Sequence, residues 1–260
     1  LGRPQWVGGL LPTTQKGVDI VITLDISGSM MAEDMSPNRA EAAKEVAERF
    51  IAGRVSDRIG LVAYAVEAYT QCPLTLDHAM LVSILKNLNV GTIKADGTAI
   101  GMALAEAGAR LKDSQAKSKV IILLTDGVNN TGAIDPMTAA EIVRVLGLKV
   151  YTIGIGSKEG GRVPLGRDIF GRIVYSREVM ELDENLLKSI AESTGGKFYL
   201  ARDSRALNEV FSEIDRLEKS EFAWKAPRTY TEAYRSFLFP ALALLFFEIA
   251  LRTTRLRRFP

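Results

Sequence analysis

The chain has 260 residues, of which 47% are hydrophobic and 25% are charged, as in an ordered globular protein. Its formal charge of +2 is small, and its basic residues are scattered except at the extreme C-terminus, so we expect no nucleic-acid partner. The only cysteine is Cys72 and the only histidine is His78. This excludes an internal disulfide, a Cys/His zinc cage and any Ser-His-Asp triad built without His78.

Short β-branched runs alternate with longer amphipathic stretches over residues 17–220, which is the pattern of a parallel sheet covered by helices on both faces. The first strand, 19–25, is almost continuously apolar, as expected for a strand buried on both faces, and it runs into a polar loop. Ser36-Pro37 predicts the start of a helix that ends near Arg54, with a serine cap and a proline in the first turn.

The next two strands, 58–64 and 68–74, are predicted to form an antiparallel hairpin, because a parallel crossover needs about a dozen intervening residues or more. The predicted fold class is α/β: a doubly wound, mostly parallel six-stranded sheet with helices on both faces, in one domain over residues 17–220. The remaining strands are predicted at 119–126, 149–155 and 197–201, and the remaining helices at 77–88, 98–111, 136–146, 184–193 and 204–219.

The stretch 157–176 interrupts the alternation of strands and helices. It is rich in glycine, which predicts an inserted loop or a small hairpin rather than an element of the core. Two interpretations stay open for it. It is either a recognition loop or a surface excursion with no task of its own.

An apolar run, 237–251, lies near the end of the chain. It predicts a transmembrane helix over 236–252 that follows a juxtamembrane linker over 221–235. A spanning helix needs about 20 apolar residues, and this run is shorter and contains Glu248. A buried terminal helix therefore remains the alternative.

The residues that follow the apolar run are strongly basic. Positively charged flanks of membrane helices stay in the cytoplasm, so we expect a basic cytoplasmic tail over 253–260 and the folded domain on the other side of the membrane. The basic residues are Arg252, Arg255, Arg257 and Arg258.

Oxygen-bearing side chains follow two of the buried strands. The first strand ends in Asp25-Ile26-Ser27-Gly28-Ser29, and alternation within this loop lets its aspartate and two serines turn toward one point. A later strand ends at Asp126, and Thr98 lies at the start of a helix. In doubly wound sheets, ligands bind beyond the carboxyl ends of the strands, where the strand order reverses. We therefore expect these three segments to converge.

A site that offers only oxygen ligands suits a hard cation. Mg²⁺ fits a site in which a few protein oxygens share the ion with several waters, and Ca²⁺ or Mn²⁺ are alternatives. Neutral hydroxyls among the ligands leave such an ion strongly electrophilic, so it would bind a carboxylate supplied from outside. This chemistry predicts adhesion to a protein partner and not catalysis.

These motifs resemble, in order and spacing, the metal-ion-dependent adhesion site (MIDAS) of von Willebrand factor type A domains. They are D-x-S-x-S from Asp25, the threonine of DGTAIG at Thr98 and the aspartate of LLTDG at Asp126, and the resemblance covers about residues 18–217. It implies that the serine and threonine hydroxyls contact the metal, that the aspartates act directly or through water, and that an acidic residue of the partner completes the shell. These roles fall on Asp25, Ser27, Ser29, Thr98 and Asp126.

A narrower resemblance rests on NRAEAAK at 38–44, DRIGLV at 57–62 and QCPLTLD at 71–77, together with RPQW near the start. These segments are similar to the bacterial BatA/BatB aerotolerance proteins. The resemblance implies an inner-membrane protein with a periplasmic A domain, which works with a BatB-like protein and a MoxR-type AAA+ ATPase in envelope stress or aerotolerance. Residues 1–16 would then follow a membrane helix that is missing from this chain.

Two other functions remain open at this point. In a phosphotransferase of the haloacid dehalogenase type, Asp25 would be the nucleophile, Thr125 would assist and Mg²⁺ would be bound. That family carries a second acidic residue two places on, where this chain has Ser27. The other alternative is a purely structural site, in which the metal or the hydroxyls tie loops together without a partner.

Overall fold

The chain divides into two compact units, 16–222 on the one hand and 1–15 with 223–260 on the other. The computed structural model describes residues 5–7, 17–90, 97–157, 161–167, 170, 172–178, 182–224, 230–232 and 234–254.

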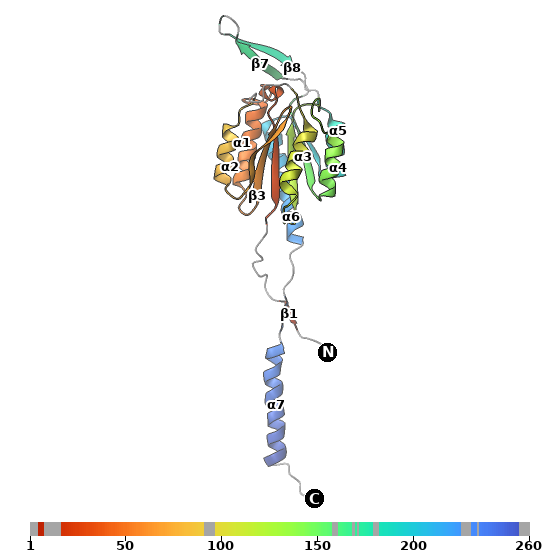
Figure 1. Ribbon diagram of the computed structural model, residues 1–260. Coiled ribbons are helices and arrows are strands. Elements are labelled where there is room, and N and C mark those ends of the chain that lie inside the picture. Colours follow the sequence, from red (N-terminus) through yellow and green to blue (C-terminus); the bar gives the residue numbers. More distant parts are fainter. Residues whose placement is uncertain are drawn as a thin grey trace. The chain divides into compact units, whose positions relative to one another are not determined.

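The larger unit is built on a six-stranded sheet in the order β4-β3-β2-β5-β6-β9 (Figure 1). All pairs are parallel except that of β3 with β4 at one edge, which confirms the predicted fold class and the predicted hairpin. The strands are β2 (Asp19–Asp25), β3 (Arg58–Tyr64), β4 (Ala68–Thr75), β5 (Lys119–Thr125), β6 (Lys149–Ile155) and β9 (Phe198–Ala201).

The strand order reverses between β2 and β5. From β2 the chain adds β3 and β4 on one side, and it then returns to add β5, β6 and β9 on the other side. Leu24 of β2 is in register with Leu124 of β5, so the two strands end next to each other. This places a topological switch point beyond the carboxyl ends of β2 and β5.

Helices cover both faces of the sheet and bury two separate cores (Figure 1). All seven residues of β2 are buried, because alternate side chains enter opposite cores. Ile20 and Ile22 pack with α1, α2 and α6 on one face, while Val21 packs with α3, α4 and α5 on the other. The helices are α1 (Arg39–Ala52), α2 (His78–Asn87), α3 (Ile100–Leu111), α4 (Pro136–Val145), α5 (Glu184–Ser193) and α6 (Ser204–Trp224).

Helix α1 begins later than Ser36-Pro37 predicts. Its cap is Asn38, whose side chain accepts a hydrogen bond from the backbone N–H of Glu41 at 2.8 Å. The prediction was wrong because Asn38 followed three residues later by Glu41 is itself a helix-start signal, and it lies closer to the apolar stripe.

Helix α3 starts at Ile100 and not at Thr98, because the carbonyl of Thr98 accepts from the N–H of Asn130 at 3.1 Å and does not begin the helical hydrogen bonds. The N–H of Ala99 donates to the carbonyl of Ala65 at 2.7 Å, and the N–H of Thr98 donates to Oδ1 of Asn130 at 2.8 Å. Tertiary contacts thus hold Thr98 in the loop before the helix.

The insertion after β6 forms an antiparallel hairpin of β7 (Gly161–Arg167) and β8 (Ile173–Glu178), which is a two-stranded sheet of its own (Figure 1). Its base lies against the loop that follows β2. A Cβ on Gly161 would be 2.8 Å from Cβ of Ala32, so only glycine allows this approach.

In the smaller unit, β1 (Gln5–Val7) pairs antiparallel with β10 (Tyr230–Glu232), and α7 (Tyr234–Thr254) is a helix. Among the described residues, however, none of the helices is both long enough and apolar enough to cross a membrane. The predicted transmembrane helix over 236–252 is therefore not supported. Glu248 interrupts the apolar run and pairs with Arg252 at 2.8 Å.

Candidate metal centre

The predicted metal ligands lie at the switch point of the sheet. Asp25 is the last residue of β2, and Asp126 directly follows β5, its neighbour in the sheet. Both aspartates are buried, so two carboxylates from separate segments enter the same water-poor region. Burying two like charges costs free energy unless a cation or hydrogen bonds compensate them.

The loop after β2 turns its oxygens toward one another. Oδ1 of Asp25 accepts a hydrogen bond from the N–H of Ser27 at 2.9 Å, and the hydroxyls of Ser27 and Ser29 lie 3.0 Å apart. The short 3₁₀ helix η1 (Gly28–Met31) starts inside this loop and turns the chain sharply. The alternation predicted for the three polar side chains is thus present.

Hydrogen bonds link this loop to the end of β5. The Ser29 hydroxyl donates to Oδ1 of Asp126 at 2.8 Å, and the Thr125 hydroxyl donates to Oδ2 of Asp25 at 3.0 Å. Four of the five predicted ligands, Asp25, Ser27, Ser29 and Asp126, therefore belong to one hydrogen-bonded cluster.

The fifth predicted ligand, Thr98, comes from the loop before α3. Its hydroxyl oxygen would be 3.4 Å from a Cβ on Gly127, which places it beside the turn that carries Asp126. Gly97 has a φ of 151°, and a Cβ there would be 2.5 Å from Cγ2 of Thr131, so glycine is required. Asp96, the first residue of the predicted Asp-Gly-Thr segment, lies outside the described residues.

Two asparagines that the sequence analysis missed hold the Thr98 loop. Asn130 accepts from the N–H of Thr98 at 2.8 Å and donates its own N–H to the carbonyl of Thr98 at 3.1 Å. Asn129 accepts from the N–H of Ile100 at 2.8 Å. The available signal was an Asn-Asn pair three residues after Asp126, since asparagine side chains substitute for backbone groups in turns.

A buried arginine, also missed, connects the cluster to α1. Arg39 makes a bidentate contact with Asp34, at 2.8 Å from Nε and 2.7 Å from Nη2, and its Nη1 donates to Oδ2 of Asp126 at 2.9 Å. Asp126 thus shares its carboxylate between Arg39 and the Ser29 hydroxyl. The one clue in the sequence was a cation at the first residue of a helix, where the helix dipole disfavours it.

The carboxyl group of Asp25 has a raised pKa within the cluster. Burial, the larger cause, and the negative charge of Asp126 together raise the pKa of Asp25 to about 7, and hydrogen bonds from Ser27 and Thr125 only partly oppose this rise. Arg39 contacts Asp126 and Asp34. A cation beside Asp25 would favour its ionised form, so the electrostatics of the cluster fit a bound metal ion.

The donor set also limits the choice of metal. Among the described residues, no three His, Cys, Asp or Glu side chains gather into a metal-binding group. A cation at the switch point would therefore rest on two carboxylates and on hydroxyls, all of them oxygens. Hard ions such as Mg²⁺ and Ca²⁺ prefer such ligands. His78 takes no part, because its ring contacts the carbonyl of Asp57, just before β3.

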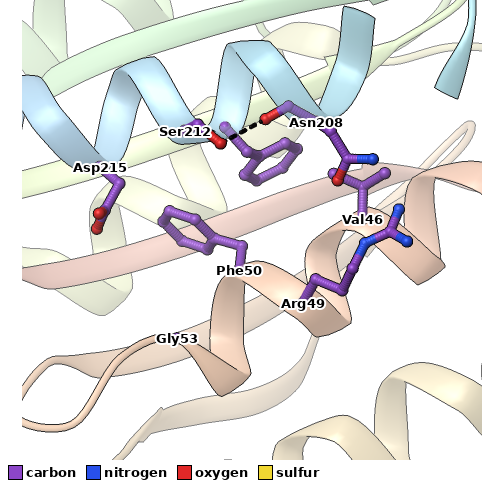
Figure 2. Close-up of a pocket in the computed structure, with 8 residues that line it drawn as sticks. Val46, Arg49, Phe50, Gly53, Asn208, Ser212 and Asp215 are labelled. Carbon is purple, nitrogen blue, oxygen red and sulfur yellow. Dashed lines mark hydrogen bonds between the residues drawn. The ribbon is translucent and has the colours of Figure 1, made fainter. Parts of the chain in front are cut away.

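A pocket of about 350 Å³ lies elsewhere, between α1 and α6 (Figure 2). Phe50 and Phe211 meet in it with ring centroids 5.0 Å apart. None of the predicted ligands lines it, so it belongs to the packing of α6 on α1. Its lining residues are Val46, Arg49, Phe50, Gly53, Asn208, Phe211, Ser212 and Asp215.

A doubly wound sheet with an oxygen-rich cluster at its switch point defines a class of α/β domain that commonly binds a metal through this cluster. The model of the von Willebrand factor type A domain matches residues 19–213, and the chain belongs to this family. Domains of this family are generally interaction modules.

Solved structures show which members of the family the chain resembles. The chain is similar to BatB from Bacteroides thetaiotaomicron, with 31% identity over 80% of this chain and 100% of that chain and a TM-score of 0.67. It is equally similar to an aerotolerance-related membrane protein from Bacteroides fragilis, with 30% identity over 78% of this chain and 100% of that one and a TM-score of 0.66. The resemblance to the BatA/BatB aerotolerance proteins is confirmed.

Other relatives are longer than this chain. A protein of Borreliella burgdorferi is 35% identical over 88% of the chain, and the match spans 67% of that protein. A match to a Mycobacterium avium protein at 29% identity covers 76% of the chain and 59% of the relative. Proximal thread matrix protein 1 of the mussel byssus, solved with zinc in its MIDAS motif, is 20% identical over 76% of this chain and 47% of that one, with a TM-score of 0.56. This last likeness shows the fold alone.

Proposed function

We propose that this domain binds Mg²⁺ at the switch point and, through the metal, an acidic residue of a partner protein. One observation carries the proposal. Buried carboxylates and serine hydroxyls from two neighbouring strand ends meet in one hydrogen-bonded cluster, in which burial and the charge of Asp126 raise the pKa of Asp25 to about 7. The metal would be held by Asp25, Ser27, Ser29, Thr98 and Asp126.

Each part of the cluster has a separate task in this proposal. Asp25 and Asp126 supply the negative charge that attracts the ion, while Ser27, Ser29 and Thr98 supply neutral oxygens. A bound divalent ion with few anionic ligands acts as a strong acceptor for one further carboxylate. The surrounding hydrogen bonds keep the oxygens in place before the ion arrives, which reduces the ordering cost of binding.

The proposal is tested by titrating Mg²⁺ into the metal-free protein while thermal unfolding is followed. We expect a concentration-dependent rise in the midpoint of unfolding for the wild type, because a ligand that binds only the folded state stabilises it. Asp25→Ala should abolish the rise, and parallel titrations with Ca²⁺, Mn²⁺ and Zn²⁺ rank the ions. A wild type that responds to none of these ions would refute metal binding.

Two further measurements separate interaction from the alternative functions. If the metal only tied loops together, Thr98→Ala would change the thermal midpoint and nothing else; loss of partner binding at an unchanged midpoint supports an interaction site. If the domain were a phosphotransferase, it would hydrolyse p-nitrophenyl phosphate in Mg²⁺ and Asp25→Asn would abolish this turnover. We expect no such turnover, since Ser27 stands where the second acidic residue would be needed and its hydroxyl contacts that of Ser29.

We further propose that the protein is an adaptor held at the bacterial inner membrane with its type A domain in the periplasm. The proposed partners are a BatB-like protein and a MoxR-type AAA+ ATPase, and the proposed setting is envelope stress or aerotolerance. Similarity to BatB and to an aerotolerance-related membrane protein supports this setting. So does α7, where the described side chains from Leu238 to Leu251 include many exposed large apolar groups that need a cover.

The adaptor proposal is tested in cells of the source bacterium. The chain should fractionate with membranes and resist carbonate extraction, and added protease should digest its domain only after the outer barrier is opened. Crosslinking followed by mass spectrometry should recover a BatB-like protein from the wild type and much less of it from Asp25→Ala. Recovery in the soluble fraction would contradict the membrane attachment, and equal crosslinking in both strains would contradict a metal-dependent contact.

A further inference from the structure

The β7–β8 hairpin is fixed to the loop that carries the candidate metal ligands. The N–H of Glu33 donates to the carbonyl of Arg162 at 3.1 Å, and the N–H of Ser157 donates to Oδ2 of Asp34 at 2.9 Å. Asp34 is bound by the same guanidinium that binds Asp126. The base of the hairpin is thus connected through hydrogen bonds to one of the proposed ligands, Asp126.

The hairpin presents aromatic and arginine side chains to solvent. Phe170 is 78% exposed, Tyr175 is 39% exposed, and the side chain of Arg162 is 70% exposed. The guanidinium of Arg162 lies 5.1 Å from the ring centroid of Tyr175, and the hydroxyl of Tyr175 donates to Glu33 at 3.4 Å. Tyrosine and arginine are enriched in the energetically important parts of protein interfaces. Their preordered contact lowers the ordering cost of binding.

The charge and the backbone of the hairpin indicate what it would bind. The stretch 157–178 holds five basic and three acidic residues. In the described part of the chain, β7 and β8 pair as strands only with each other, so apart from the Arg162 carbonyl, which accepts from Glu33, their outer edges are available to an added strand. A segment with more basic than acidic residues and with open strand edges suits an extended acidic segment. The same partner must bring a carboxylate to the metal site next to it.

We propose that the β7–β8 hairpin is a second contact surface, which binds an extended acidic segment beside the partner's metal-binding carboxylate. This inference rests on the proposed function. Arg162 pairs with an acidic side chain of the segment, and Tyr175 packs against its backbone. Anionic lipid could also attract arginine, but the attachment of the hairpin to the metal loop favours one protein that touches both surfaces.

The experiment uses a displayed library of linear peptides, selected on the full chain in Mg²⁺. We expect the selected peptides to contain Asp or Glu and to lose binding in EDTA and in Asp25→Ala. Arg162→Ala and Tyr175→Ala should each weaken the selected synthetic peptides by about tenfold, the typical effect of an interface anchor. Neither variant should change Mg²⁺ affinity measured without peptide.

Two matched controls come from other surfaces of the domain. Arg144 is an exposed arginine on α4 that pairs with Glu141, as Arg162 pairs with Glu33. Tyr69 on β4 is 48% exposed and donates to Glu67, as Tyr175 donates to Glu33. Arg144→Ala and Tyr69→Ala should leave peptide affinity unchanged.

The outcomes separate this inference from the proposed function. Peptides that bind in a metal-dependent way but bind the hairpin variants as tightly as the wild type would overturn the hairpin surface alone. Absence of Mg²⁺ binding by the wild type would overturn the proposed function and the inference with it. Hairpin variants that lose binding to phosphatidylglycerol vesicles while keeping peptide affinity would overturn it in favour of lipid.

Discussion

Replacing Arg39 by methionine should destabilise the metal-free protein strongly. Methionine preserves most of the apolar stem but removes the guanidinium that binds Asp34 and Asp126. The arginine and both carboxylates are almost completely buried, so two carboxylates lose a guanidinium contact in a water-poor region. Breaking a buried ion pair by removing one partner costs about 3–5 kcal/mol. The free energy of unfolding of a typical domain is about 5–15 kcal/mol, so the variant should remain folded.

Added Mg²⁺ should restore part of this loss. Once Arg39 is gone, its guanidinium no longer competes with the metal for Asp126, and the metal supplies a larger share of the positive charge near both aspartates of the site. The increase in the free energy of unfolding on adding Mg²⁺ should therefore be larger in Arg39→Met than in the wild type. Urea unfolding in EDTA measures the stability that the metal-free variant loses, and urea unfolding in saturating Mg²⁺ measures how much of it the metal restores.

Arg54→Met is the matched control. Arg54 is also buried and also contacts two aspartates, Asp57 and Asp215, but it lies near the end of α1 and none of the proposed ligands is among its partners. Its loss should reduce stability without enlarging the effect of Mg²⁺. The reasoning fails if Arg39→Met unfolds at the same urea concentration as the wild type in EDTA, or if Mg²⁺ stabilises both variants equally.

Four further predictions concern the same site. Calorimetric Mg²⁺ affinity should fall about tenfold from about pH 8 to pH 6, because Asp25 must lose a proton with a pKa of about 7; a constant affinity contradicts this. Because that pKa lies above the unfolded value of 3.8, metal-free stability should decrease as the pH rises between the two values. Asn130→Ala should leave the N–H of Thr98 unpaired, cost about 1–3 kcal/mol in denaturant unfolding and weaken Mg²⁺ binding, unlike Asn87→Ala at an exposed position of α2. Gly97→Ala should cost about 1–3 kcal/mol because of its positive φ, and unchanged unfolding would refute this.

Local patterns were sufficient to predict the sheet and its helices. β2 is apolar at nearly every position, and only a strand buried on both faces requires that, so its bounds of Asp19–Asp25 were predicted correctly. The three residues between β3 and β4 are too few for a parallel crossover, which determines their antiparallel pairing. Helix α5 follows its predicted bounds because its apolar spacing and its Asp183 cap agree.

Helix starts were less predictable where distant segments compete for the backbone. Thr98 is typical of a helix cap, yet its carbonyl accepts from the N–H of Asn130, 32 residues away, and α3 starts later. No local pattern reports such a contact, because it depends on which loops the sheet brings to the same edge.

The polar residues expected to converge were visible in the sequence for a general reason: the loops after neighbouring parallel strands meet at one edge of a sheet. Short motifs with two or three oxygens can therefore be assigned to one place before any coordinates exist. The residues that form hydrogen bonds to those oxygens cannot be assigned in this way. Arg39 binds Asp126 across 87 positions of sequence, and the hairpin base binds Asp34 across 123. Contacts over such separations arise only when the packing of α1 on the sheet brings the groups within hydrogen-bonding distance, so the tertiary structure alone decided them.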